Sequence, residues 1–453
     1  MSGVQDRRGT GADGHPARER IVPKHGATQE GPTTRDVAAA SGTTYDLIVV
    51  GGGIHGICAT LEAARAGCKV LLLERGTPAG ETSANSLQIL HGGFRYLQDL
   101  DVGRLRESVR ARSWWLGHFP DLCEPLECLL PLDGRGVRRP PLFRLALAAY
   151  GLFARDADPA LLRGEVVSAA QRPQLAELFP EPRPRAFAVW FDGLFPQPRR
   201  LADELLRWAT AAGAVVLPRM EARTLLLDRD SASNATLSAS TVVGVRARDH
   251  ETDREVELRA SRVLDTAGPW NGWWRGTSAD SASTSRLHPP SVAFNLLFRG
   301  QLPDSCALAA RAPDGMNLFL WERDGCIHAG TRHLPWTTAV TVPSVTSADV
   351  ASLVDDLRCA VPGLGLAESN LVEVQVGFLP ARAPGAAEMA RRDRFEAGPA
   401  AGAPRGLVSV SGVKYTTAPV VARQALAMLF GAPLSIRSDA ARPAISRVPA
   451  GER

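Results

Sequence analysis

The sequence predicts an α/β fold, and two observations support this. The first is a short apolar segment, 45–50, followed by glycines, by good helix formers over 54–66 and by a second apolar segment, 69–73. Gly67 ends the helical run. A strand, a helix and a strand in this order form a βαβ unit with parallel strands.

The second observation is that helices and strands continue to alternate. Leu201, Leu205 and Trp208 recur at helical spacing, and Gly213 ends that predicted helix. Further strands are predicted over 215–217, 242–245 and 262–265. Alternation over this length indicates a sheet with helices packed on it.

Length and composition indicate a folded protein of two domains. The 453 residues are 45% hydrophobic and 22% charged, which is ordinary for globular proteins. The net charge of +4 is small and the basic residues are scattered, which argues against nucleic acid as a partner. A small anionic molecule remains compatible with this charge.

The cysteines and the apolar runs give an expectation for location. The seven cysteines form no C-x-x-C pair and no Cys/His cluster, so we expect buried thiols and no metal site. No run approaches the roughly 18 apolar residues that span a bilayer, and no secretory signal is evident. We therefore expect a cytoplasmic protein.

Three parts of the chain look peripheral to the fold. Residues 1–42 are rich in Gly, Arg, Thr, Pro and Ala and predict a disordered tail, with the fold beginning at Tyr45. The segments 231–240 and 277–285 have the composition of surface insertions. We also expect a tail over 431–453.

A dinucleotide site is predicted where the first strand meets the first helix. Gly51, Gly53 and Gly56 match G-x-G-x-x-G in this context. The first glycine permits the tight turn, the second lets the backbone approach a pyrophosphate, and the third allows close packing of helix on strand. Glu74 closes the second strand, where a carboxylate accepts hydrogen bonds from ribose hydroxyls. The alternative is an ordinary turn with a strand-capping Glu74.

A second turn favours FAD over NAD. The segment 264–269, Leu-Asp-Thr-Ala-Gly-Pro, ends a predicted strand with small residues. We expect this turn to pass close to the first glycine loop. A plain turn is the alternative.

Several further segments, in order over about 44–430, resemble FAD-dependent glycerol-3-phosphate dehydrogenases, within the wider D-amino-acid oxidase-like group. The specific ones are H-G-G-F-R-Y-L at 91–97 and S-G-V-K-Y-T-T at 411–417. Thr82-Ser83, Ser86, Ala267 to Trp270, Gly330-Thr331 and the stretch from Gly377 to Pro380 also match. The resemblance implies a Rossmann-like FAD-binding domain and a second α+β substrate domain built on an antiparallel sheet.

The resemblance also implies a set of flavin-binding residues. Hydroxyls near 82–86 would meet the phosphate and the ring edge, and Gly92 and Gly93 would let the backbone approach the ring. The helix predicted over 420–429 would point its positive end at the flavin. The expected FAD contacts are Gly51, Gly53, Ile54, His55, Gly56, Glu74, Arg75, Thr82, Ser83, Ser86, His91, Gly92, Gly93, Ala222, Ala267, Gly268, Trp270, Gly377, Gly412, Val413, Lys414, Tyr415 and Thr416.

Lys414 is the most informative basic residue. Of 52 basic residues, 49 are arginine and only three are lysine, so a lysine in this Gly/Thr loop is not explained by background usage. We expect it to hold a polar group of the substrate or to stabilise reduced flavin. Arg95 and Arg392 complete an expected anion-holding set. A solvated surface charge is the alternative for each.

The chain departs from the family pattern near the substrate. Leu379 replaces an arginine, Ala418-Pro419 replaces Tyr-Arg, and Arg332-His333 follows Gly330-Thr331 where the family has an acid. The C-terminal helical domain of the family is not expected after residue 430. Arg332, or Arg382, restores the phosphate site only if it points inward. Glycerol 3-phosphate is therefore one candidate among small anionic alcohols.

The predicted reaction is hydride transfer from the carbinol carbon of a small anionic or phosphorylated alcohol to flavin N5. His55 and His91 are the candidate bases, each with a structural role as the alternative. Competing hypotheses are an oxygen-dependent amine, amino-acid or hydroxy-acid oxidase, and a non-catalytic flavoprotein. Quinone, dioxygen and a protein carrier all remain candidate electron acceptors.

We expect the FAD-binding domain over 43–103, 195–275 and 371–430 and the substrate domain over 104–194 and 276–370. The apolar run 142–153, interrupted by Arg144, predicts a helix. It is either a core helix or a peripheral contact with the inner membrane face. Trp114-Trp115 and Trp273-Trp274 leave the same two interpretations open.

Overall fold

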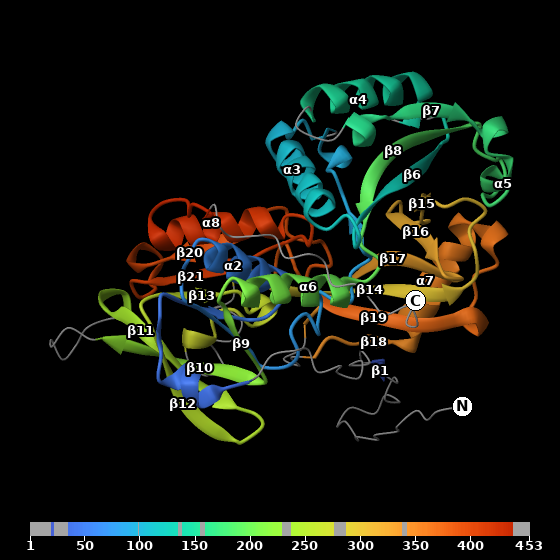
Figure 1. The fold of residues 1–453 in the computed structure, drawn as a ribbon. Helices are drawn as coiled ribbons and strands as arrows, with labels where there is room; N and C mark the ends of the chain where they lie inside the picture. The colour runs from blue at the N-terminus through green and yellow to red at the C-terminus, as the bar shows by residue number, and fades with distance from the viewer. Residues whose placement is uncertain are drawn as a thin grey trace.

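The computed structural model describes residues 20–21, 35–97, 99–134, 138–154, 159–228, 237–275, 287–337 and 342–437. Within these residues the chain forms two large sheets, one smaller sheet and a two-stranded pair. Figure 1 shows the two large sheets side by side, with the helices α2, α6 and α8 over one of them. The predicted α/β class is confirmed.

The first large sheet has six strands in the order β20-β21-β13-β3-β4-β9. It is parallel except for β20, which pairs antiparallel with β21. Its strands are β3 (Leu47–Val50), β4 (Val70–Glu74), β9 (Val215–Pro218), β13 (Val263–Asp265), β20 (Arg394–Ala397) and β21 (Leu407–Ser411).

Both faces of this sheet are covered, which explains its continuous apolar strands. Leu47 and Val49 pack against the helices α2 (Ile54–Arg65), α6 (Pro198–Ala211) and α8 (Ala418–Phe430). Ile48 and Val50 pack on the opposite side, against a four-stranded sheet. That sheet has the order β10-β11-β12-β2 and comprises β2 (Thr44–Tyr45), β10 (Met220–Asp228), β11 (Thr241–Asp249) and β12 (Arg254–Ala260).

The second large sheet has nine strands and is mostly antiparallel, as expected for the substrate domain. Its main order is β19-β14-β17-β16-β15-β6-β8-β5, with β7 paired to β8. The strands are β5 (Ile89–Leu90), β6 (Glu124–Leu132), β7 (Glu165–Ser168), β8 (Ala186–Leu194), β14 (Pro290–Arg299), β15 (Ala307–Arg311), β16 (Asn317–Arg323), β17 (Cys326–Pro335) and β19 (Leu371–Pro380).

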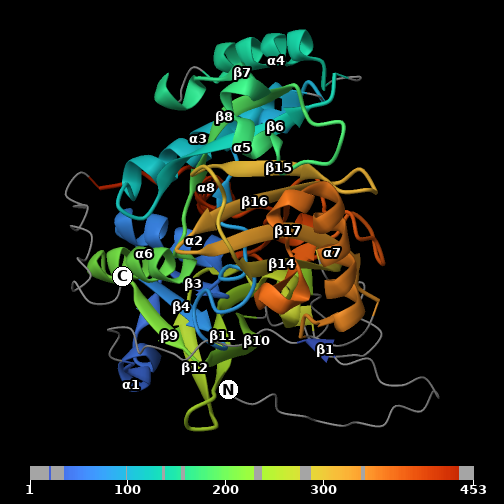
Figure 2. The same cartoon turned by 90° about the vertical axis from the view of Figure 1, so that its right-hand side faces the viewer.

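Helices lie on both sides of this sheet. Figure 2 shows α7 (Ser347–Ala360) on one face of the sheet, and α3 (Val102–His118) and α4 (Pro140–Phe153) at the end formed by β6 to β8. α5 (Pro173–Ala176) is a single turn near β8. Trp115, near the end of α3, is fully buried in the core beneath α2 and α8, so α3 joins the two halves of the molecule. Trp274 is also buried, so both tryptophan pairs contribute to cores.

The apolar run 142–153 forms α4, but only one of its faces is buried. Phe143, Leu147 and Tyr150 are buried, whereas Leu142, Leu145 and Leu152 are 48%, 68% and 50% exposed. In the described part of the chain, no helix has both the length and the apolar character needed to cross a bilayer.

Two of the predicted boundaries differ from the structure. Part of the expected tail is folded: α1 (Val37–Ser41) follows Arg35, which forms ion pairs with Asp249 and Glu251. β1 (Arg20–Ile21) pairs with β18 (Val345–Thr346). The rest of 1–34, the segment 277–285 and the residues after 437 lie outside the described residues. β19 belongs to the nine-stranded sheet, so we now assign 371–380 to the substrate domain.

Candidate functional site

The glycine loop between β3 and α2 depends on close backbone contacts. Gly51 has φ +99°, and a side chain there would lie 2.7 Å from the Thr266 carbonyl oxygen and 2.8 Å from Ala267 Cα. At Gly56 a side chain would overlap the Gly51 carbonyl oxygen. The Thr266 hydroxyl donates to the carbonyls of Val50 and Gly51 at 2.9 and 3.0 Å. The expected contact between this loop and the turn after β13 is confirmed.

Beside Gly53, the same loop has free space next to its backbone. The nearest atom to a side chain there would be Ser83 Oγ, at 3.6 Å. The first hydrogen bond of α2 runs from Ile57 N–H to the Gly53 carbonyl, so the N–H groups of His55 and Gly56 precede the helical ladder. Such N–H groups at a helix start bind phosphate.

Glu74 contacts the loop backbone. Its carboxylate accepts hydrogen bonds from Gly52 N–H and Gly76 N–H, each at 2.7 Å. Burial raises the pKa of Glu74, and these two hydrogen bonds oppose the rise. The residue therefore shapes the loop, in addition to any bond to a ribose.

The segment after β4 is held on the nine-stranded sheet. The Thr82 hydroxyl donates to the Phe378 carbonyl at 2.9 Å and accepts from Phe378 N–H at 3.1 Å. A side chain at Gly377 would lie 3.0 Å from the same hydroxyl. Thr82 and Gly377 therefore have a structural role in joining the domains. Ser83 Oγ instead accepts from Ile54 N–H at the start of α2, at 3.0 Å.

His91 follows β5 and is anchored by a buried acid. Its Nδ1 lies 3.0 Å from Asp192 Oδ2, and its side chain is 42% exposed while that of Asp192 is 3% exposed. Gly92 N–H donates to Asp192 Oδ1 at 2.7 Å. The fully buried Arg112 lies 3.5 Å from the same oxygen.

Packing within the protein also explains the two glycines after His91. A side chain at Gly92 would overlap Arg112, and one at Gly93, where φ is +82°, would lie 2.9 Å from Ser108 and from Tyr96. We expected these glycines to admit a flavin ring. Close packing on α3 is a sufficient reason for both.

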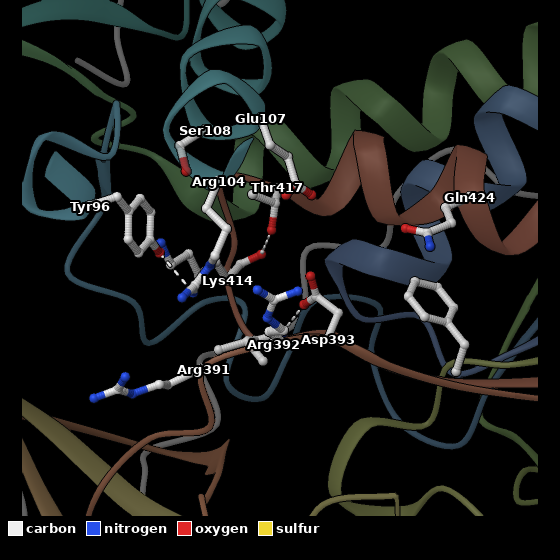
Figure 3. Close-up of a pocket in the computed structure, with 12 residues that line it drawn as sticks. Tyr96, Arg104, Glu107, Ser108, Arg391, Arg392, Asp393, Lys414, Thr417 and Gln424 are labelled. Carbon is white, nitrogen blue, oxygen red and sulfur yellow. Dashed lines mark hydrogen bonds between the residues drawn. The ribbon is translucent and has the colours of Figure 1, made fainter. Parts of the chain in front are cut away.

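Lys414 lies in the loop before α8, against an aromatic ring. Its Nζ is 4.2 Å from the centre of the Tyr96 ring, and the Arg104 guanidinium is 4.2 Å from the same ring. Arg104 also donates to the Tyr96 hydroxyl at 3.0 Å. Burial, followed by the charge of Arg95, lowers the pKa of Lys414 to about 7. Figure 3 shows Lys414 and Arg104 beside Tyr96.

A cavity of about 230 Å³ opens beside Lys414. Its charged lining comprises Arg104, Glu107, Arg391, Arg392, Asp393 and Lys414. Arg392 is 79% exposed at its side chain and lies 3.7 Å from Asp101. Arg392 and Lys414 thus line one cavity (Figure 3).

Arg95 lies near both Lys414 and His333. Burial, followed by the charges of Arg95 and Arg332, lowers the pKa of His333 to about 4. The charge of Arg95 thus acts on both Lys414, in the loop before α8, and His333, in β17. No periodicity or motif in the sequence singles out His333.

Arg332 does not join this group in the expected way. It forms ion pairs with Asp314, at 2.9 Å, and with Asp356 on α7. The helix α7 packs on the face of the sheet that holds Phe294 and Leu296. The expectation that Arg332 points into the anion site is corrected, because two carboxylates already hold it.

The Lys414 loop is supported from behind by core aromatic residues. Tyr415 stacks on Phe195 with ring centres 4.3 Å apart, so its side chain belongs to the core. The Trp115 indole N–H donates to the Thr416 carbonyl at 2.9 Å. Val413 N–H donates to Asp393 at 2.6 Å.

His55 packs on the same loop. A side chain at Gly412 would overlap the His55 ring, and burial lowers the pKa of His55 although Asp393 opposes this. His55 Nε2 and Ser86 Oγ are buried and have no hydrogen-bond partner within the described structure. Buried polar atoms normally have partners, so these two indicate where a polar ligand fits.

The remaining expected contacts surround the turn after β13. Trp270 lies under the Arg75 guanidinium, 3.9 Å from its ring centre. Gly268 has φ +58°, and a side chain there would meet open space. Ala222 lies in β10 opposite Ala247, packed on the core between the two sheets of the first domain.

Sequence reasoning missed Asp192, Arg112, Tyr96 as a cation platform, and His333. No motif or spacing in the sequence singles out Asp192 or Arg112. Their pairing depends on β8 and α3 meeting behind His91, a contact between residues 80 positions apart.

The site as a whole fits FAD. The free N–H groups of His55 and Gly56, the open Gly53 and the unpartnered Ser86 Oγ provide donors and room for a phosphate-bearing ligand. The open turn at Gly268 and the Lys414 loop complete its surroundings.

Comparisons with known proteins agree with this geometry. The alpha-glycerophosphate oxidase of Streptococcus pyogenes is 27% identical over 348 residues, 74% of this chain and 54% of the relative. The aerobic glycerol-3-phosphate dehydrogenase of Bacillus subtilis is 25% identical over 381 residues, covering 82% of this chain and 64% of the relative. The chain thus spans only about half to two thirds of these relatives' lengths.

A solved structure shows the same fold. The glycerol-3-phosphate dehydrogenase from Bacillus halodurans, complexed with FAD, superposes with a TM-score of 0.63 at 20% identity, covering 88% of this chain and 68% of that one. The model of the FAD dependent oxidoreductase family, DAO, matches residues 46–428. The expected cofactor, FAD, is confirmed by this match, and the chain belongs to the DAO family of FAD-dependent oxidoreductases.

Proposed function

We propose that this chain oxidises a hydroxyl group of a small phosphorylated alcohol, with glycerol 3-phosphate as the leading candidate. The observation that carries the proposal is the cavity that Lys414 and Arg392 line together, with Arg95 close enough for its charge to act on Lys414. The names of the two relatives, alpha-glycerophosphate oxidase and aerobic glycerol-3-phosphate dehydrogenase, support the same substrate class.

The two cations favour an anionic substrate. Burial and the charge of Arg95 lower the pKa of Lys414 to about 7, which means that its charged form is disfavoured in the free protein. A bound phosphate or carboxylate would reverse this by pairing with both side chains. Arg392 lines the same cavity as Lys414 and is exposed enough to turn toward an anion.

His91 is the stronger candidate for the base. Its ring is partly exposed and carries a carboxylate partner, as a general base requires. The His55 ring instead packs against Gly412, and we assign it to positioning the Lys414 loop.

FAD, when bound, supplies the acceptor for the hydride that leaves the carbinol carbon. The glycine loop, Ser83 and the start of α2 would hold its phosphates. Lys414 and Arg95 would orient the anionic end of the substrate, and His91 Nε2 would take the hydroxyl proton. The substrate loses two electrons and one proton from its carbon as the hydride, and a second proton from its hydroxyl. It leaves as a carbonyl compound.

The departures from the family pattern limit how the phosphate is held. Leu379 lies in β19, and its carbonyl accepts a hydrogen bond from Ser291 at 3.2 Å, so it offers no cation. Arg332 is held by two carboxylates. The proposal therefore rests on Lys414, Arg95 and Arg392.

Anaerobic flavin reduction tests this proposal. The FAD-loaded protein is mixed with glycerol 3-phosphate, glycerol, lactate or glycine, and the flavin absorbance is followed. We expect bleaching by glycerol 3-phosphate and much slower bleaching by glycerol, which lacks the anion. Preferential bleaching by glycine or lactate would point to the amine or hydroxy-acid oxidase hypothesis, and no bleaching by any compound would favour a non-catalytic flavoprotein.

The electron acceptor is a separate question. Peroxide formed under air would identify dioxygen, and reduction of a soluble quinone analogue without peroxide would identify a quinone.

We propose that the exposed face of α4 contacts a membrane surface. Its apolar residues Leu142, Leu145 and Leu152 lie beside Arg144, a combination typical of interfacial helices.

A further inference from the structure

We infer that Asp192 is a positioning residue that holds His91 in the tautomer and orientation of a general base. This inference rests on the proposed function for the role of His91, but it concerns a residue that lies behind the site. Asp192 is at the end of β8, and His91 immediately follows β5, the neighbouring strand.

The Asp192 carboxylate fixes both the ring and the backbone of the HGG segment. Oδ2 lies 3.0 Å from His91 Nδ1, and Oδ1 accepts from Gly92 N–H at 2.7 Å. The Trp190 indole N–H lies 3.3 Å from Oδ2. One carboxylate thus sets the direction of the imidazole relative to its own main chain.

Asp192 remains ionised although it is buried. Burial raises the pKa of the carboxyl, but the hydrogen bond and charge of His91, the charge of Arg112 and the Gly92 N–H together bring the pKa below its usual value. Arg112 is fully buried and also donates to the Phe191 carbonyl at 2.5 Å. A permanent carboxylate can accept a hydrogen bond from Nδ1–H and can donate none.

The ring is also confined from the side. Its centre lies 5.2 Å from the centre of the Phe319 ring, at an interplanar angle of 56°. With Nδ1–H directed at Asp192, the free lone pair is on Nε2 of this partly exposed imidazole. That nitrogen is then free to take the proton of the substrate hydroxyl.

Within the described residues, the charged or titratable groups that contact or act on Asp192, besides His91, include Arg112 from α3, Cys128 from β6, whose sulfur lies 3.9 Å from Asp192, and Tyr150 from α4. Burial raises the pKa of Tyr150 to about 12 and that of Cys128 well above its ordinary value, so both stay neutral through the physiological range.

The variant Asp192→Asn tests the inference. An amide can donate to Nδ1, which would move the proton to Nε2 and remove the base. We expect the rate of anaerobic flavin reduction by glycerol 3-phosphate to fall by about 10²- to 10⁴-fold, with substrate affinity changed much less. The acidic limb of the remaining pH profile should shift to lower pH, because the negative charge beside the imidazole is lost.

Two control variants separate this role from simple support of the fold. Asp203→Asn makes the same chemical change on the exposed side of α6 and should leave rate and pH profile unchanged. Trp190→Phe removes a donor to Asp192 but keeps the carboxylate, so the acidic limb should stay in place. Asp192 would have only a structural role if Trp190→Phe and Asp192→Asn lowered the rate of flavin reduction equally and neither variant shifted the acidic limb of the pH profile.

A readout without substrate keeps the inference testable if the proposed function fails. Nitrogen-15 NMR of histidine-labelled protein, with His91 assigned from His91→Gln, reports which ring nitrogen carries the proton. We expect the Nδ1–H tautomer in the parent protein and its loss in Asp192→Asn. An Nε2–H tautomer in the parent protein would overturn the inference, whereas absence of flavin reduction by any alcohol would overturn only the proposed function.

Discussion

The ammonium of Lys414 lies 4.2 Å from the centre of the Tyr96 ring. The two residues come from the two family-specific segments of the sequence, so this contact joins them in space. Tyr96 is 2% exposed and is also contacted by Arg104 on α3. The contact fixes Lys414 at the junction of the two domains and explains how a lysine is kept in a partly buried place.

The pKa of Lys414 predicts how anion binding depends on pH. Because this pKa is lowered to about 7, the side chain loses its proton in the free protein as the pH rises through 7. Affinity for sulfate, whose charge is constant, should fall between pH 6 and 9, by at most about tenfold per pH unit above 7. Calorimetric titration with sulfate measures this, and Lys414→Arg, which keeps its charge, should show a flatter profile.

The lowered pKa of Lys414 also predicts whether the folded protein gains or loses stability as the pH rises. An unfolded lysine keeps its proton up to about pH 10.4, so between pH 7 and this value the unfolded state binds more protons than the folded state. Lys414 should therefore make the folded protein more stable as pH rises through this window. In Lys414→Arg, the free energy of unfolding should lose this dependence on pH, whereas in Lys69→Arg, the matched control, it should keep it. An identical pH response in the two variants would contradict the assignment to Lys414.

A pair of glycine variants separates the two roles of the first loop. Gly56→Ala should destabilise the protein without FAD by about 2 kcal/mol or more, because the new methyl group overlaps the Gly51 carbonyl. Gly53→Ala has 3.6 Å to its nearest neighbour, so stability without FAD should change little while FAD affinity falls at least about tenfold. Thermal unfolding and FAD titration measure the two effects, and a Gly53→Ala protein with unchanged FAD affinity would exclude pyrophosphate from this position.

Local patterns in the sequence were sufficient to predict the first domain. The strand at 47–50, the glycine loop and the helix at 54–65 each carry their own signal, since parallel buried strands are continuously apolar and a helix start after glycines is distinctive. The turn after β13 was also predictable, because small residues follow a strand there. The fold of 35–42 was missed because it depends on ion pairs to Asp249 and Glu251, more than 200 residues away.

The site was predictable only in part, for a physical reason. Motifs identify residues that share a local backbone conformation, and so they named His91, Arg95 and Lys414. They carry no information on which side of a strand a neighbour faces, which is why Arg332 was expected in the site and His333 was not. Asp192 and Arg112 required the pairing of β5 with β8 and the packing of α3, which only the tertiary structure provides.

Arg392 is predicted to contribute to substrate affinity. Its side chain lines the cavity beside Lys414 and its only described carboxylate contact, with Asp101, is 3.7 Å long. Arg392→Ala should raise the KM for glycerol 3-phosphate about tenfold with a smaller change in kcat, since an exposed charge is lost from binding. Arg382→Ala removes an exposed arginine that pairs with Glu388 outside the cavity lining and should change neither constant. Equal effects of the two variants would argue for a general effect of surface charge.

The outer face of α4 is predicted to bind lipid. Leu145 is 68% exposed in the middle of this face, and burying it in a bilayer would remove apolar surface from water while Arg144 meets anionic headgroups. Leu145→Ser should therefore reduce cosedimentation with vesicles containing anionic lipid by several-fold, with flavin reduction by a water-soluble substrate unchanged. Val372→Ser, at a 51% exposed position in β19, is the matched control and should sediment like the parent protein. If the parent protein does not bind vesicles at low salt, or if both variants lose binding equally, α4 is not the membrane contact.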